Sequence, residues 1–212
     1  MGRLRAPPAD RTPQSPLAVK SAAAKRRPTY YKVVEGHAAA RDTWQIHNDV
    51  TGSDIRTLIM ADSNGVTLSK VQLPDDVQAY AFRGARLTDI RRVLERAGTL
   101  PNIRTLAITA GINDRHSDPS DVVAALRHLK TWGDQLGKQV LLVGTPTFHT
   151  LKPHAQRAVE HLNKTAEDLF GANYIQPIPA DKVEIVDENG WGIHYSSATA
   201  GHVFDTIKPR LN

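Results

Sequence analysis

The chain has 212 residues, 40% of them hydrophobic, and a formal net charge of +5 at pH 7. This length suits one well-buried α/β domain with a tail, and no apolar stretch approaches the roughly 18 residues that a membrane span needs. The sequence has no cysteine, which excludes disulfides, thiolate catalysis and cysteine-ligated zinc. The start of the chain lacks the apolar segment of a secretory signal, so we expect a soluble, intracellular protein, cytoplasmic or nuclear.

Residues 1–32 are basic and poor in large apolar side chains. They hold eight Arg and Lys residues and one acidic residue, a net charge of +7, whereas the other 180 residues hold 19 basic and 21 acidic side chains. Such a segment cannot bury enough surface to offset its ordering entropy, so we expect a disordered basic N-terminal arm. Three interpretations stay open: a solvated tail, an arm that contacts nucleic acid or another acidic surface, or a targeting segment.

From residue 55 onward, short apolar runs alternate with helical patterns, as is typical of a parallel sheet flanked by helices. The predicted fold class is α/β: one three-layer α/β/α domain over residues 55–212, with a flavodoxin-like, five-stranded parallel sheet. Residues 33–54 are polar and unpatterned and stay unassigned as a connecting segment. Strands are expected at 57–60, 77–82, 105–109, 139–144 and 174–178, and helices at 89–97, 120–136, 153–170 and 197–207.

Polar residues follow several of these strands directly. In a doubly wound sheet, ligands bind beyond the carboxyl ends of the strands, so one edge of the sheet should collect residues 62–64, 83–84, 111–114 and 147–149. Ser63 ends the first strand and begins a turn, where backbone N–H groups point toward anything bound at its oxygen. Serine, aspartate and asparagine are also the commonest helix caps, so this stretch alone leaves a purely structural role open.

Four segments of the sequence contain candidate site residues: ADSN at 61–64, FRGAR at 82–86, GIND at 111–114 and NGWGIHYSSATAGHV at 189–203. Their order and spacing in the chain are more specific evidence for a protein family than any one segment alone. Together they resemble the SGNH, or GDSL-type, hydrolase superfamily over roughly residues 55–210. The resemblance implies a serine esterase with Ser63 as nucleophile, His194 as base, and Gly84 and Asn113 as oxyanion-hole donors. The chemistry agrees, because a histidine with a pKa of about 6.5 can activate a serine near neutral pH, and preorganised donors stabilise the oxyanion.

The sequence departs from this family at two positions. Ala61 stands where the family usually has glycine, and Trp191 stands where an aspartate usually orients the histidine. An indole cannot accept the imidazole proton, so Asp187 and Glu188 are candidate orienting acids, and a backbone carbonyl is a third candidate for orienting the ring. Trp191, with the loop residues His149 and His116, is a candidate substrate contact. No pair of histidines has zinc-ligand spacing, and we expect neither a metal nor a cofactor.

The leading hypothesis is therefore an acyl hydrolase with a Ser-His pair that acts on a small ester or O-acyl group. The alternative is a weakly active or inactive SGNH-like binding module whose residues 1–32 contact nucleic acid. Trp191 in the acid position and the concentration of charge in residues 1–32 favour that alternative. The GARLTDI and GKQVLLVGTP segments further resemble the esterase-like domains of some retroelement proteins, a setting that a basic arm would fit. A nucleotide-binding domain is disfavoured, since no glycine-rich phosphate loop follows the first strand. The sequence indicates neither the acyl and alcohol groups nor the oligomeric state.

Overall fold

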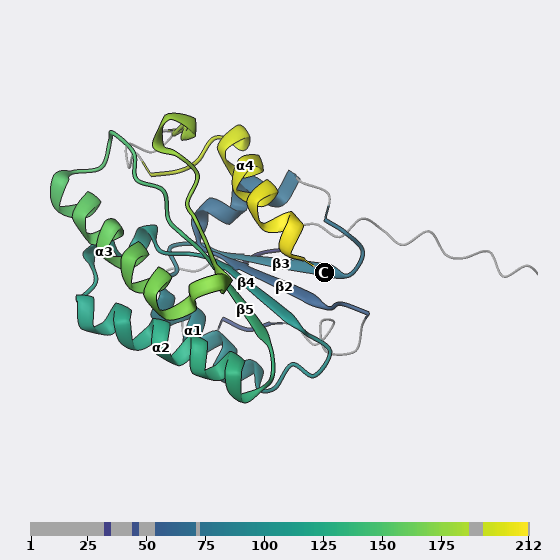
Figure 1. The fold of residues 1–212 in the computed structure, drawn as a ribbon. Coiled ribbons are helices and arrows are strands. Elements are labelled where there is room, and N and C mark those ends of the chain that lie inside the picture. Colours follow the sequence, from purple (N-terminus) through teal and green to yellow (C-terminus); the bar gives the residue numbers. More distant parts are fainter. Residues whose placement is uncertain (1–31, 35–43, 47–53, 71–72, 187–192, 212) are drawn as a thin grey trace, which may run out of the picture.

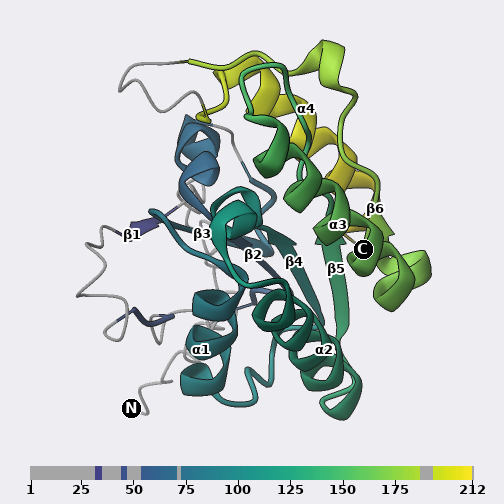
Figure 2. The ribbon, with the colours of Figure 1, turned by 90° about the vertical axis from the view of Figure 1, so that its left-hand side faces the viewer.

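The computed structural model describes residues 32–34, 44–46, 54–70, 73–186 and 193–211 (Figures 1 and 2). Its centre is a parallel sheet with the strand order β1-β3-β2-β4-β5-β6. The strands are β1 (Lys32–Val34), β2 (Thr57–Ala61), β3 (Val77–Phe82), β4 (Thr105–Thr109), β5 (Gln139–Val143) and β6 (Tyr174–Ile175). The predicted α/β fold class is confirmed, and all five predicted strands are present.

The sixth strand, β1, was missed by the sequence analysis. It pairs in parallel with the outer edge of β3, with Lys32 opposite Tyr80 and Val34 opposite Phe82. A run of three residues is too short to show strand periodicity, and this run crosses the predicted boundary between the arm and the connecting segment. Residues 1–31 lie outside the described residues, so the disorder and limits of the basic arm stay predictions.

Four α-helices of the described residues flank the sheet (Figure 2). The side chains of the strands alternate between the two faces of the sheet. Leu58 and Met60 of β2 pack on one face with the buried sides of α1 and α2, whereas Ile59 and Ala61 pack on the other face with α4. This alternation follows from the two-residue period of a strand and produces the predicted three layers. The helices are α1 (Leu87–Ala97), α2 (Pro119–Gln135), α3 (Pro153–Phe170) and α4 (Ser197–Ile207). Among the described residues, no helix is long and apolar enough to cross a membrane.

The strand order creates a switch point between β2 and β4. The chain leaves β2 toward β3 and leaves β4 toward β5, so the two connections run in opposite directions across the sheet. They therefore pass over opposite faces, and their first residues form a crevice at the carboxyl edge. Residues 62–65 and 110–113 begin these two connections.

Part of the unassigned connecting segment belongs to the core. Trp44 is buried, and its ring centroid lies 5.4 Å from that of Phe82. The guanidinium of Arg96 donates to the Trp44 carbonyl oxygen at 3.0 Å, which fixes the segment against the end of α1. An isolated tryptophan among polar residues shows no periodicity, and this explains why the sequence pattern did not reveal its packing.

The turn after β2 continues as the 3₁₀ helix η3 (Ser63–Lys70), which packs against small side chains. A Cβ atom built on Gly65 would lie 2.3 Å from the Cβ of Ala61 and 3.1 Å from that of Ala81. These neighbours are the first atoms of short side chains in the sheet, so they cannot move aside. Gly65 is therefore required for η3, and with it Ser63, to lie close to β2 and β3.

We expect Gly65→Ala to lower the free energy of unfolding by about 1–3 kcal/mol, because the added methyl group overpacks a rigid contact. Urea denaturation measures this change. Gly201→Ala is the matched control, since Gly201 lies inside α4 with nothing within 4 Å of an added Cβ. That substitution should raise stability by about 0.5–1 kcal/mol through helix propensity. Equal effects of the two substitutions would contradict the packing argument.

Candidate active site

The carboxylate of Asp62 joins the ends of β2 and β4. It is buried, and it accepts hydrogen bonds from the backbone N–H of Asn64 at 2.9 Å and of Gly111 at 3.2 Å. The first bond shapes the tight turn in which Ser63 lies, and the second ties that turn to the loop that carries Asn113. Ser63 is the first residue of η3 and is partly exposed at this edge.

A second buried hydrogen bond brings the C-terminal loop to the same place. The side-chain oxygen of Asn64 accepts from the backbone N–H of Tyr195 at 3.0 Å. His194, directly before Tyr195, is held through its carbonyl oxygen, which accepts from Val186 N–H at 2.8 Å. Ser63 and His194 are therefore each next to one partner of a single hydrogen bond, although they lie 131 positions apart in the chain.

The two predicted oxyanion donors lie on segments that are bonded to each other. The side-chain amide of Asn113 donates to the Ala85 carbonyl oxygen at 3.0 Å, and the carboxylate of Asp114 accepts from Leu87 N–H at 3.0 Å. Gly84 has φ of 74°, a left-handed conformation that glycine adopts without strain. Because a side-chain amide carries two hydrogens, the bond to Ala85 fixes the Asn113 amide and leaves it a second hydrogen to donate.

Two buried carboxyl groups near this edge have raised pKa values. Burial is the main cause for both, and it raises the pKa of Asp62 to about 6 and that of Asp114 to about 7. Hydrogen bonds from backbone N–H groups lower both values in part. For Asp114 the negative charge of Asp62 adds to the increase, and its Oδ1 is buried with no hydrogen-bond partner among the described residues. An unpartnered carboxylate oxygen away from water disfavours the ionised form.

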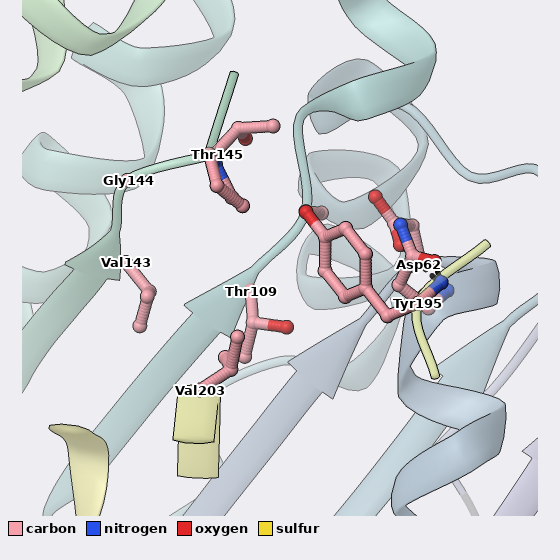
Figure 3. Close-up of a pocket in the computed structure, with 10 residues that line it drawn as sticks. Asp62, Thr109, Val143, Gly144, Thr145, Tyr195 and Val203 are labelled. Atoms are coloured by element: carbon pink, nitrogen blue, oxygen red, sulfur yellow. Dashed lines mark hydrogen bonds between the residues drawn. The ribbon is translucent and has the colours of Figure 1, made fainter. Parts of the chain in front are cut away.

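A small cavity of about 20 Å³ lies beside Asp62, between the ends of β4 and β5 and Val203 in the middle of α4. Figure 3 shows the Tyr195 ring between Asp62 and Thr145. Burial, with a smaller effect from Asp62, raises the pKa of the Tyr195 phenol well above its usual value. The ring also packs edge-on against Phe148, with centroids 6.5 Å apart. This volume holds about one water molecule and no acyl group, so a substrate would occupy the open edge outside it.

The loop after β5 is also fixed by a side chain. Asn163 of α3 accepts from Thr145 N–H at 2.9 Å and donates to the Thr145 carbonyl oxygen at 2.7 Å. Gly111 packs against the same residue, because a Cβ on Gly111 would lie 2.3 Å from Thr145 Oγ1. With φ of 155°, Gly111 also adopts a backbone conformation that other residues rarely take. The loops after β4 and β5 therefore fit against each other only with glycine at this position.

The other predicted site residues fall into two groups. His116 is exposed at the end of the 3₁₀ helix η4 (Ile112–His116), and His149 is exposed in the loop after β5. Asp187, Glu188 and Trp191 lie outside the described residues, so their roles as candidate orienting acids and substrate contact stay predictions. Among the described residues, no group of three His, Asp or Glu side chains could hold a metal ion.

Sequence reasoning missed the residues that hold the site together. The sequence pattern places Asp62 and Asn64 beside Ser63 but predicts no role for either. Their spacing offered one local signal, since an aspartate often accepts from the N–H two residues later. The bonds to Gly111 and Tyr195 had no local signal, because these partners lie 49 and 131 positions away.

Comparisons with known proteins agree with this architecture. No family model and no curated protein matches the sequence. Solved structures do match, among them a catalytic mutant of an acetylxylan esterase from Geobacillus stearothermophilus, with 13% identity, a TM-score of 0.58 and coverage of 76% of this chain and 95% of that chain. A lipase/acylhydrolase from Enterococcus faecalis matches with 20% identity, a TM-score of 0.53 and coverage of 74% of this chain and 98% of that chain. A GDSL-like lipase from Bacteroides thetaiotaomicron matches with 12% identity, a TM-score of 0.53 and coverage of 74% of this chain and 88% of that chain. The chain therefore has the fold of the SGNH, or GDSL-type, hydrolases.

The raised pKa of Asp114 predicts a pH dependence of stability. A carboxyl group with a raised folded-state pKa stabilises the fold fully below its unfolded pKa of 3.8 and loses this contribution as the pH rises toward about 7. The loss amounts to at most about 1.4 kcal/mol per pH unit in that window. Asparagine has no carboxyl group to titrate, so Asp114→Asn removes this pH dependence. The free energy of unfolding of the variant, relative to that of the wild type, should therefore rise between pH 5 and pH 8, as measured by urea denaturation.

Asp118→Asn is the control for this measurement. Asp118 caps α2 by accepting from Ser120 N–H, and its hydrogen bonds with Ser120 lower its pKa. Its titration therefore lies below pH 3.8, and its stability difference from the wild type should be constant between pH 5 and pH 8. The same constant difference for Asp114→Asn would show that the Asp114 pKa is not raised.

Proposed function

We propose that this chain is an SGNH-type serine hydrolase that cleaves a small ester or O-acyl group. One observation supports this most strongly: the buried hydrogen bond between Asn64 and Tyr195, which holds the segments of Ser63 and His194 side by side. The segments of Gly84 and Asn113 are bonded to each other, and in this proposal they would bring N–H donors to the hydroxyl of Ser63 and the imidazole of His194. The matched acetylxylan esterase and acylhydrolase folds also favour this function.

In the proposed reaction, His194 takes the proton from the Ser63 hydroxyl as its oxygen attacks the ester carbonyl carbon. The carbonyl oxygen becomes negative and accepts hydrogen bonds from Ser63 N–H, Gly84 N–H and the Asn113 amide. Loss of one such donor typically costs about 3–4 kcal/mol of transition-state stabilisation. The protonated His194 then gives its proton to the leaving alcohol. Water, activated by the same imidazole, hydrolyses the acyl-enzyme and restores the serine.

An orienting group for His194 completes the proposal. Main-chain bonds already fix the histidine backbone, since its carbonyl oxygen accepts from Val186 N–H. Asp187 or Glu188 would supply the carboxylate that holds the imidazole tautomer and balances its positive charge, while Trp191 would form part of the substrate pocket. Because an orienting acid can contribute as much as about 10⁴ in rate, a site without one would be a weak hydrolase.

We expect Ser63→Ala to lower the hydrolysis of p-nitrophenyl acetate by about 10³-fold or more, because no other group would form the acyl-enzyme. The exposed Ser197 at the start of α4 provides the matched control, and Ser197→Ala should retain wild-type turnover. Circular dichroism verifies that both variants are folded. Wild-type turnover by Ser63→Ala would exclude Ser63 as the nucleophile, and a wild type that hydrolyses no ester would favour the inactive binding module.

A second proposed function concerns the basic arm. Residues 1–32 carry a net charge of +7, while the rest of the chain is slightly acidic, so positive charge is concentrated on one segment. We infer that this arm contacts nucleic acid through phosphate groups, as would suit a retroelement-type protein. Such binding releases condensed counterions and is therefore weakened by salt.

Replacing Lys25, Arg26 and Arg27 with Gln should weaken binding to single-stranded RNA. The slope of log K against log salt concentration should shrink by about 2, because each lost phosphate contact contributes roughly 0.7. Fluorescence anisotropy at several salt concentrations measures this slope. As a control, Lys130→Gln with Lys164→Gln removes two cations that form ion pairs with Asp134 and Asp168. Unchanged binding by the arm variant would reject the proposal.

A further inference from the structure

Five basic side chains gather beside the predicted oxyanion donors. They come from three segments: the loop between β3 and α1, the turn η4, and the start of α3. We call them the basic rim, which consists of Arg86, Arg115, His116, Lys152 and His154. Arg86 is two residues past Gly84, and Arg115 is two residues past Asn113, so the rim borders the edge where the oxyanion would form.

Contacts across the rim show that its members are close in space. The imidazole rings of His116 and His154 have centroids 6.1 Å apart, which places η4 next to the first turn of α3. Partial burial lowers the pKa of His116, and the charges of Arg115, His154, Arg86 and Lys152 lower it further. Four neighbouring groups therefore act on one imidazole with the same sign.

Acidic groups around the rim only partly balance this charge. Among the described residues, none of the five rim side chains forms an ion pair within 4 Å. The buried Asp62 acts on Arg115, and the buried Asp114 is influenced by Arg86. Both carboxyl groups lie beneath the surface, and both have raised pKa values, so they neutralise the rim least in mildly acidic solution. The N-terminal end of α3 adds partial positive charge at the same place.

A purely structural role does not account for this arrangement. Like charges that face one another destabilise the fold, and the Arg115 guanidinium donates a hydrogen bond to its own turn, at the Ile112 carbonyl oxygen. A bound anion would convert this repulsion into attraction. Arginine guanidinium groups and protonated imidazoles both donate to carboxylate and phosphate oxygens.

We propose that the basic rim binds an anionic group, a carboxylate or a phosphate, of the molecule that enters the candidate site. The location of this anion beside the reacting ester rests on the proposed hydrolase function, whereas the binding of the anion does not. The site would then select acyl esters that carry a negative charge over neutral esters of the same size.

Nuclear magnetic resonance titration of the full chain tests the binding step. The full chain carries Ser63→Ala, and the pKa of His116 is followed while succinate or inorganic phosphate is added. We expect a saturable rise of this pKa, because a bound anion stabilises the imidazolium. The double variant Lys152→Gln with His154→Gln should bind the anion more weakly, with a dissociation constant about two- to fivefold higher for each charge removed. Lys130→Gln with His128→Gln is the matched control on α2 and should leave the constant unchanged.

The two anions distinguish the chemical classes. Saturation by succinate alone indicates a carboxylate, saturation by phosphate alone indicates a phosphate, and saturation by both indicates recognition of charge. The proposal is overturned if neither anion gives a saturable change, or if the rim variant and the wild type have the same dissociation constant.

Hydrolysis by the wild type then separates this proposal from the proposed function. The ratio of kcat/KM for p-nitrophenyl hemisuccinate to that for p-nitrophenyl acetate should exceed one and fall with added salt. A saturable titration without cleavage of either ester supports the anion site and rejects the hydrolase. Cleavage of both esters with equal kcat/KM and no saturable titration rejects the anion site and leaves the hydrolase standing.

Discussion

The candidate site depends on one buried carboxylate. Burying the charge of Asp62 is costly, and the structure offsets this cost with hydrogen bonds from Asn64 N–H and Gly111 N–H. These bonds join the ends of two neighbouring parallel strands at the one point where their connections diverge. A neutral side chain of the same shape would need a different set of donors. The geometry of the turn at Ser63 therefore follows from satisfying the Asp62 carboxylate.

The remaining parts of the edge are attached to this turn by polar groups rather than by large side chains. Asn64 extends the connection from Asp62 to the loop of His194, and the turn that carries Asn113 is bonded to the loop that carries Gly84. Small residues allow the close approach, as Gly65 does above β2. A site made of backbone N–H groups and short side chains is rigid, and preorganised donors of this kind are what oxyanion stabilisation requires.

Local patterns predicted most of the fold, and spacing predicted which residues share the edge. The helices α3 and α4 begin and end where the apolar periodicity indicated, and α2 begins at Pro119, one residue before its predicted start. The strand β1 and the packing of Trp44 were missed, because three residues and one aromatic ring show no periodicity. The bonds that Asp62 accepts from Gly111 N–H and Asn64 accepts from Tyr195 N–H could not be predicted, since both depend on how distant segments meet. Motif order still brought Ser63 and His194 into one hypothesis, and the Asn64–Tyr195 bond now gives that hypothesis a physical basis.

The measurement that tests the central claim most directly is covalent labelling of the full chain with a fluorophosphonate, followed by mass-spectrometric mapping of the labelled residue. A serine activated by His194 should react and carry the label at Ser63, and His194→Gln should abolish labelling without unfolding the protein. Because a fluorophosphonate needs no matching acyl or alcohol group, the result does not depend on the natural substrate. A folded protein that takes no label, or takes it at a serine other than Ser63, would contradict the account.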